Sequence, residues 1–251
     1  FLYLSNTLSN EQFFDFGWRM PFILSAVLIV IGLYVRLNIS ETPEFEASKK
    51  KNKPLTAPFM TVFKEHFKPL FIGTFVALAT FVLFYLMTVF VASWSIEELG
   101  MTRDKFLENQ IISVIFFALF IPISALLADR FGRKPILIIA SFLIVLFGLS
   151  LSFLLGSSDS QSILITLSIG MALMGITYGP LGTILSELYP TNVRYTGASL
   201  SFNLAGIFGA SLAPFIALWL STNFGIQFVG YYLSIAAVIS LICVSLSSKA
   251  K

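Results

Sequence analysis

Cysteine, histidine and charged residues are all scarce in this sequence of 251 residues. It has one cysteine (Cys243) and one histidine, and only 12% of its residues are charged. A single cysteine excludes an intrachain disulfide, and so few thiols and imidazoles exclude a clustered Cys/His metal site. The motifs HExxH, GxSxG and GxxxxGK[ST] are also absent. We therefore predict that the chain is not an enzyme and binds no organic cofactor or metal.

Apolar residues are abundant instead, and they occur in long uninterrupted runs. The chain is 57% hydrophobic and contains 27 phenylalanines. Apolar runs of 18 or more residues are typical of helices that cross a lipid bilayer, and continuous rather than alternating runs argue against a β-barrel. The sequence thus predicts an all-α membrane protein. Its seven spans are expected at 18–39, 68–94, 109–128, 135–155, 161–186, 197–220 and 226–247.

The segments outside the spans suggest how the chain is organised. Residues 1–17 look like the end of a truncated apolar helix followed by an outer loop, so we expect the chain to be a fragment. Residues 40–66 form the one long loop, which contains the run KKKNK. After Pro58, a helical spacing of aromatic residues predicts a short helix in the membrane interface. Residues 67–251 then hold the remaining six spans.

Basic residues are divided unequally between the two sides of the predicted membrane. If the spans alternate in direction, 13 of the 16 Lys and Arg residues fall on the side of the 40–66 loop, whereas the 13 acidic residues divide almost evenly. Lys and Arg determine orientation, so this loop and the C-terminus are expected in the cytoplasm. Because the charge is segregated by loop, the net charge of +3 indicates membrane topology rather than nucleic-acid binding.

None of the charged residues lies near the middle of a predicted span, where such residues usually mark a proton or substrate pathway. The candidates for substrate contact are therefore polar and aromatic residues deep in the spans. Gly179 and Pro180 directly follow the candidate Tyr178 and are expected to weaken the helix that contains it. The alternative for each candidate is a structural hydrogen bond to a neighbouring helix. The candidates are Tyr85, Thr88, Tyr178 and Asn203.

Two short cytoplasmic turns carry the most informative charges. In LLADRFGRKPI, four charges fall within six residues, and a six-residue connection makes the flanking spans antiparallel neighbours. Gly132 permits the backbone reversal. In SELYPTNVRYTG, an acid again ends one span and a base precedes the next. Such acid–base pairs could hold the cytoplasmic ends together in one conformation and release them in another. We call these residues the latch: Asp129, Arg130, Gly132, Arg133, Glu187 and Arg194.

The motifs of these turns resemble those of a known family. DRFGRKP is similar to the D-R-x-G-R-[RK] loop of the major facilitator superfamily. GWRMPF, ETPEF and ELYPTNVRYTGAS followed by FNLAGIFGASLAP resemble, in the same order, the metabolite:proton symporters, which include proline/betaine, 2-oxoglutarate, shikimate and citrate carriers. The resemblance implies a major facilitator-type fold, with one helix and the C-terminal six-helix bundle present here and an N-terminal six-helix half missing.

The resemblance also implies a function. We expect the C-terminal part of a symporter in a bacterial inner membrane that moves a small-molecule substrate by alternating access, with a proton as the coupling ion. Its coupling acids would lie in the absent half. A proline or glycine betaine type of osmolyte is the first expectation for the substrate, and a di- or tricarboxylate is the alternative. A truncated gene product that does not transport is the third possibility.

Overall fold

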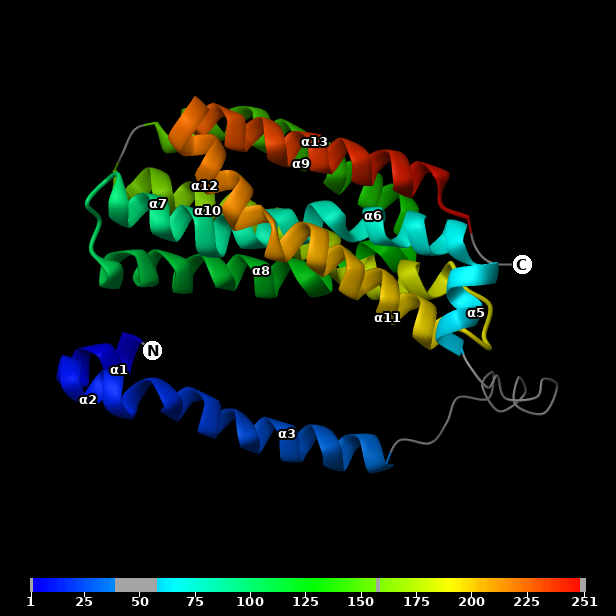
Figure 1. The fold of residues 1–251 in the computed structure, drawn as a ribbon, viewed down its shortest axis with the longest axis horizontal. Helices are drawn as coiled ribbons and strands as arrows, with labels where there is room; N and C mark the ends of the chain where they lie inside the picture. Colours follow the sequence, from blue (N-terminus) through cyan, green and yellow to red (C-terminus); the bar gives the residue numbers. More distant parts are fainter. Residues whose placement is uncertain (1, 39–57, 157–158, 249–251) are drawn as a thin grey trace. The chain divides into compact units, whose positions relative to one another are not determined.

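The computed structural model describes residues 2–38, 58–156 and 159–248, and this part of the chain consists of helices and their connections, without strands (Figure 1). The prediction of an all-α protein is confirmed. The predicted Lys-rich run at 49–53 and most of the loop that contains it lie outside the described residues.

Seven helical segments are long and apolar enough to cross a membrane, as predicted. Several extend further than their apolar runs, because polar residues at a span end can continue the helix into the interface. The segments are Gly17–Asn38, Phe67–Glu97, Arg103–Phe131, Arg133–Leu155, Ser160–Glu187, Arg194–Phe224 and Ile226–Leu246.

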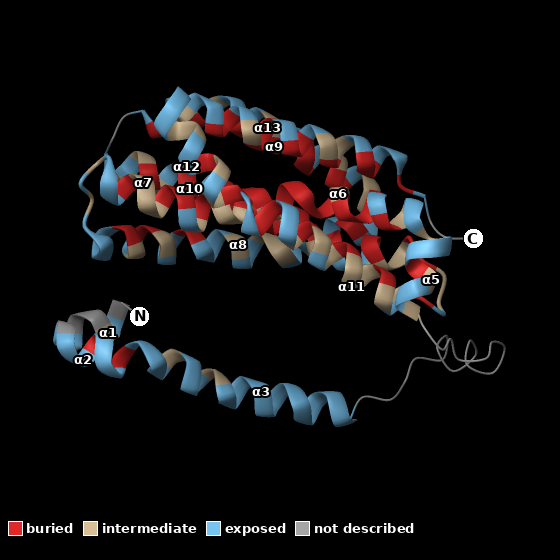
Figure 2. Cartoon of the chain, in the orientation of Figure 1, coloured by how far each residue is buried: buried red, intermediate tan, exposed pale blue. Residues whose placement is uncertain are grey.

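The chain divides into two compact units, residues 1–52 and 53–251. In the first unit, two short helices, α1 (Leu2–Thr7) and α2 (Asn10–Asp15), and one turn of 3₁₀ helix, η1 (Gly17–Arg19), precede the long helix α3 (Met20–Asn38). Within this unit, no residue of α3 is buried (Figure 2). An apolar helix that its own unit leaves uncovered needs lipid or other helices around it.

The second unit is a bundle of six spans with a short leading helix, α5 (Pro58–Glu65). This is the position at which the sequence predicts a short helix. Val62 is fully buried against the bundle, whereas Phe59 and Met60 are about half exposed. The six spans then run alternately from one end of the bundle to the other.

Two of the six spans are single helices that pack very closely together, α8 (Arg103–Phe131) and α10 (Ser160–Glu187). A Cβ atom added at Gly179 would lie 2.2 Å from Ser124 Oγ, and one at Gly175 would lie 2.8 Å from the carbonyl oxygen of Phe117. Ser124 Oγ also donates a hydrogen bond to the carbonyl of Gly175 at 3.1 Å. Glycine is therefore required on α10 for contact between the two backbones.

Gly179 and Pro180, which are expected to weaken their span, do not interrupt it, because α10 continues as one helix from Ser160 to Glu187 with Pro180 inside it. The helix tolerates the proline since neighbouring helices surround that turn, and Pro180 itself is buried. The role of Gly179 is close packing rather than flexibility.

A second close pair consists of α9 (Arg133–Leu155) and α13 (Ile226–Leu246). A Cβ atom added at Gly230 would lie 2.2 Å from the carbonyl oxygen of Gly148, and Ser234 Oγ donates to the carbonyl of Val145 at 3.0 Å. The same combination of facing small residues and one serine hydrogen bond thus holds both pairs.

The other two spans each contain a π-helical segment. One span comprises α6 (Phe67–Tyr85), the segment η2 (Leu86–Phe90) and α7 (Val91–Glu97). The other comprises α11 (Arg194–Ala205), the segment η3 (Gly206–Ser211) and α12 (Ala213–Phe224). The two spans are neighbours, since α11 and η3 both contact α6, and α12 contacts η2. π-helical segments are rare and often occur at functional sites.

The buried side chains lie between these six spans, on the inner faces of the helices (Figure 2). Ser240 on α13 links its helix to α6 through the backbone: its Oγ donates to the carbonyl of Phe75 at 2.7 Å and accepts from the N–H of Ala79 at 3.0 Å. Hydroxyl contacts of this kind add directional bonds to van der Waals packing, since the hydrophobic effect provides little driving force between helices in lipid.

Candidate functional site

The turn between α8 and α9 is shorter than the sequence suggests. The predicted six-residue connection is a single residue, Gly132, because both helices continue through the charged motif. Gly132 has φ +95° and ψ 147°, a combination that residues with a Cβ atom rarely adopt. Its N–H closes the end of α8 by donating to the carbonyl of Ala128 at 2.9 Å. The reversal therefore brings Arg133, the first residue of α9, close to Asp129 in the last turn of α8.

Arg133 links this turn to the end of α10. Its guanidinium forms an ion pair and hydrogen bond with the carboxylate of Glu187, and Nη2 lies 3.7 Å from Asp129 Oδ1. The side chains of Arg133 and Glu187 are 31% and 24% exposed, whereas Asp129 is 72% exposed. The structure thus brings together three residues of the predicted latch, and the contact with Glu187 is the more sheltered one.

The other latch residues lie at the same end of the bundle but make different contacts. The Arg194 Nε donates to the backbone carbonyl of Tyr189 at 3.4 Å, which holds the loop before α11 against its first turn. The Arg130 guanidinium lies 5.2 Å above the ring of Phe131, a cation–π geometry. That these residues release and re-form contacts during a cycle stays a prediction.

Tyr189 is a buried residue of this end that the sequence analysis did not single out. Its hydroxyl lies 2.7 Å from Ser201 Oγ, and its ring fills the space where Gly197 has no side chain. Burial raises the pKa of the Tyr189 phenol, and the bond to Ser201 opposes that shift only partly. The phenol is therefore neutral at physiological pH and joins the α10–α11 loop to α11. The tyrosine in the motif ELYP is the feature of the sequence that could have indicated this buried contact.

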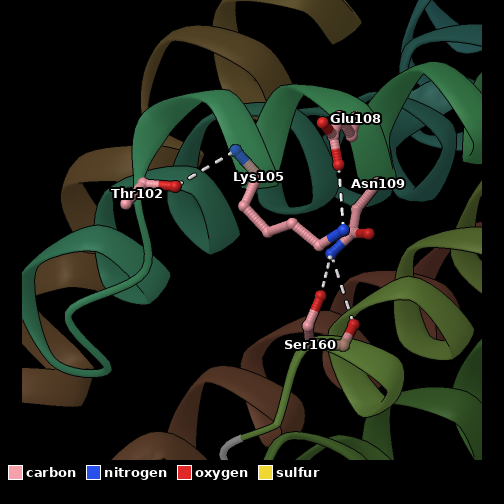
Figure 3. Close-up of polar contacts among 5 residues, drawn as sticks. All are labelled: Thr102, Lys105, Glu108, Asn109 and Ser160. Carbon is pink, nitrogen blue, oxygen red and sulfur yellow. Dashed lines mark hydrogen bonds and ion pairs between the residues drawn. The ribbon is translucent and has the colours of Figure 1, made fainter.

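At the opposite end of the bundle, a second group of polar contacts joins α8 to the start of α10 (Figure 3). Asn109 is 3% exposed, and its Nδ2 donates to the backbone carbonyl of Ser160 at 3.2 Å and to Ser160 Oγ at 3.1 Å. Thr102 caps α8 by accepting from the N–H of Lys105, whose ammonium pairs with Glu108 at 2.9 Å. The α8–α10 pair is thus linked at this end through Asn109 and further along through Ser124.

The predicted substrate contacts lie on three different spans. The Thr88 hydroxyl donates to the carbonyl of Phe84 at 2.8 Å, and Asn203 Nδ2 donates to the carbonyl of Ser199 at 2.8 Å. Both side chains therefore bond their own helices rather than a neighbouring one. Tyr85 and Tyr178 each pack their rings edge-on against a phenylalanine. Of the four candidates, Thr88 lies inside the π-helical segment η2. Tyr85 is the residue directly before that segment.

In the part of the chain that the structure describes, no group of three or more His, Cys, Asp or Glu residues could hold a metal ion. In the described residues, seven apolar helices long enough to cross a membrane, most of them packed in one bundle with an ion pair at its rim, indicate an integral membrane protein.

Comparison with known proteins identifies the family. Residues 13–208 and 111–250 match the model described as Major Facilitator Superfamily. The chain belongs to the Major Facilitator Superfamily, as its motifs indicated. The named relatives are transport proteins, which confirms that the chain belongs with transporters rather than enzymes.

Three relatives show the range of similarity. Over its whole length, the chain is 45% identical to the "Inner membrane metabolite transport protein YhjE" of Escherichia coli. It is 33% identical over 95% of its length to the "Glycine betaine/proline/ectoine/pipecolic acid transporter OusA" of Dickeya dadantii. It is 29% identical over 88% of its length to the "Shikimate transporter" of Escherichia coli. The chain spans 58%, 50% and 51% of these relatives, respectively.

Proposed function

We propose that this chain is one helical bundle of a secondary transporter that carries a small metabolite across a bacterial inner membrane by alternating access. The observation that carries the proposal is the ion pair of Arg133 and Glu187, which joins two turns of the bundle at one rim. Alternating access requires a rim that closes in one state and opens in the other, and charged contacts at partly exposed positions can do this. Relatives named as transporters support the same function.

In this proposal, the chain works together with the rest of an N-terminal half, and the substrate lies between the two halves. The 40–66 loop and the C-terminus face the cytoplasm, because most Lys and Arg residues are on that side. We expect residues 1–251 alone to give no uptake when reconstituted in liposomes, since half of the substrate site would be missing. Uptake by this chain alone would show that it is a complete carrier.

For the substrate, we propose a proline or betaine type of osmolyte. Two features support it: OusA is named for such substrates, and the rings of Phe84 and Tyr85 pack edge-on at 5.3 Å near the π-helical segment η2. Aromatic faces attract quaternary and secondary ammonium groups without a countercharge. The similarity to a shikimate transporter favours a carboxylate as the alternative.

The test is competition for uptake of labelled proline by cells that express the full-length protein. Excess glycine betaine should abolish the uptake, whereas 2-oxoglutarate and shikimate should have no effect. If the carboxylates compete and betaine does not, the alternative substrate class is correct. Inhibition by neither class would exclude both.

We further propose that the transporter couples to protons, with the coupling acids outside this chain, because no charged residue of the sequence falls in the middle of a span. Uptake should then rise when the external pH is lowered and should stop when an uncoupler dissipates the proton gradient. Uptake that needs sodium and ignores the uncoupler would exclude proton coupling.

The two groups of predicted residues should have separable effects in this protein. Thr88→Ala changes a candidate substrate contact, so we expect a higher KM with little change in kcat.

Asp129→Asn removes a latch charge far from the middle of the spans, so we expect a lower kcat with normal insertion into the membrane. Unchanged turnover in Asp129→Asn would remove Asp129 from the mechanism.

A further inference from the structure

Lys134 is the second residue of α9, yet its ammonium binds the end of another helix. Nζ donates to the backbone carbonyl of Ser245 at 2.6 Å and to that of Ser247 at 3.0 Å. These carbonyls lie at the C-terminus of α13, which ends at Leu246. The last carbonyls of a helix lack partners within the helix and carry partial negative charge. Lys134 therefore caps α13 from a position more than 100 residues earlier in the chain.

Local electrostatics do not explain a lysine at this position. Arg133 and Lys134 are the first two residues of α9, and no acidic residue lies in that first turn. Positive charge is unfavourable at the N-terminus of a helix, where the backbone dipole is also positive. The contacts with other helices offset this cost: Arg133 pairs with Glu187 of α10, and Lys134 binds α13. Two adjacent positive charges thus stand at an unfavourable helix end, and a different helix compensates each of them.

The contacts of Arg133 and Lys134 both act on the first turn of α9. Further along the helix, α9 and α13 are in backbone contact at Gly148 and Gly230, so their relative position along the helix axes is already constrained at mid-span. The bonds of Lys134 add a second constraint at the rim. A cavity of about 310 Å³ borders the turn, lined by Gly132, Arg133, Lys134, Glu187 and Ser247 among others. Without the Lys134 bonds, the first turn of α9 has space to shift.

We propose that Lys134 is a positioning residue for the ion pair of Arg133 and Glu187. By holding the first turn of α9 on the end of α13, Lys134 sets the place from which Arg133 reaches α10. Its charge therefore has a structural task beyond orienting the chain in the membrane. The expected effect on turnover rests on the transport function proposed above, but the effect on the ion pair does not.

The first experiment measures the position of α9 on α13 in the full-length protein. In a background in which Cys243 and every cysteine outside residues 1–251 are replaced by serine, spin labels replace Ile139 on α9 and Ile242 on α13, which are 55% and 50% exposed. K134Q should shift or broaden the distance distribution between the labels, and K134R, which keeps the charge and its donors, should restore it. The matched control is K68Q, which removes one exposed lysine charge at the start of α6, outside the latch, and should leave the distribution unchanged.

The second experiment measures the coupling between Arg133 and Glu187. The shifts in thermal midpoint caused by R133Q and E187Q should be strongly non-additive in the presence of Lys134. In the K134Q background, at least half of that non-additivity should be lost, and K134R should retain it. A distance distribution and a coupling that both survive K134Q would overturn the proposal.

A transport assay separates this inference from the proposed function. K134Q should lower kcat several-fold without changing KM, because the turn lies at the rim and not at the substrate site. Normal turnover despite a lost ion-pair coupling would overturn the role of Lys134 in the cycle. If no form of the full-length protein transports, the proposed function fails, while the distance and coupling measurements still decide whether Lys134 positions the pair.

Discussion

At the scale of single residues, the contact between Arg133 and Glu187 has the clearest energetic signature. Exposed ion pairs contribute about 0.2–1 kcal/mol to stability, whereas removing one partner of a buried pair costs about 3–5 kcal/mol. With side chains 31% and 24% exposed, this pair lies between the two limits. The second acid, Asp129, is 72% exposed and adds little to the stability of the bundle.

We therefore expect R133Q or E187Q alone to lower the free energy of unfolding by about 1–2 kcal/mol, a value between those limits. The double variant R133Q/E187Q should be no less stable than the worse single variant, because it leaves no unpaired charge. Denaturant unfolding of the detergent-solubilised protein measures the three values. Additive effects would show that the two side chains act independently.

Gly132 provides a second prediction at this scale. Because φ is +95° and ψ is 147°, an alanine there should cost about 1–3 kcal/mol of stability. The control is Gly182→Ala in α10, where an added Cβ meets no atom within 4 Å and alanine favours the helix. Thermal unfolding of both variants tests the prediction, which fails if Gly132→Ala is as stable as the control.

At the scale of elements, the pairing of α8 with α10 is the most constrained feature. Asn109 links the two helices at one end, Ser124 links them in the middle, and Arg133 links the turn after α8 to Glu187 at the other end. We infer that α8 and α10 move as one body. We expect bending in the two spans that contain π-helical segments, because their regular hydrogen-bond pattern is already interrupted.

Gly179→Ala tests the α8–α10 contact. The new Cβ would lie 2.2 Å from Ser124 Oγ and 2.6 Å from the carbonyl oxygen of Ile121, so one of the helices must move. Overpacking of this kind costs about 1–3 kcal/mol. Gly182→Ala, three residues further along the same helix, is again the matched control. Equal thermal midpoints for the two variants would contradict the close packing.

The sequence was sufficient for much of this architecture, for identifiable reasons. Apolar runs reveal spans directly, and the glycine of DRFGRKP indicates a reversal. The segment η3 also has a local cause: Pro214 cannot donate to the carbonyl of Ala210, so the preceding turn pairs differently. No residue of Leu86–Phe90 explains the segment η2, which has neither proline nor glycine. Its form depends on packing between spans, which sequence patterns do not reveal.

The candidate site was harder to predict from the sequence than the fold. Charges at span ends marked Asp129, Arg133 and Glu187, but the cap that Lys134 provides for α13 joins residues 111 and 113 positions apart, and no local pattern predicts it. The packing contact of Gly179 was not predicted for the same reason. The close approach of α8, which requires the glycine, is a property of the packed bundle.

At the scale of the whole molecule, the proposed orientation in the membrane rests on the distribution of basic residues. In a full-length protein in which Cys243 and every cysteine outside residues 1–251 are replaced by serine, a cysteine at Phe131, beside the charged turn, should react with a membrane-impermeant maleimide only in inside-out vesicles. A cysteine at Gly100, at the other end of the bundle, should react only in intact cells. The opposite pattern would invert the orientation.

The central claim is that the ion pair at the rim of this bundle takes part in a transport cycle. Its most direct test is the initial rate of labelled proline uptake by the full-length protein carrying Glu187→Gln, compared with the unsubstituted protein at equal amounts in the membrane. We predict a rate at least several-fold lower, with insertion and KM unchanged. An equal rate would contradict the claim.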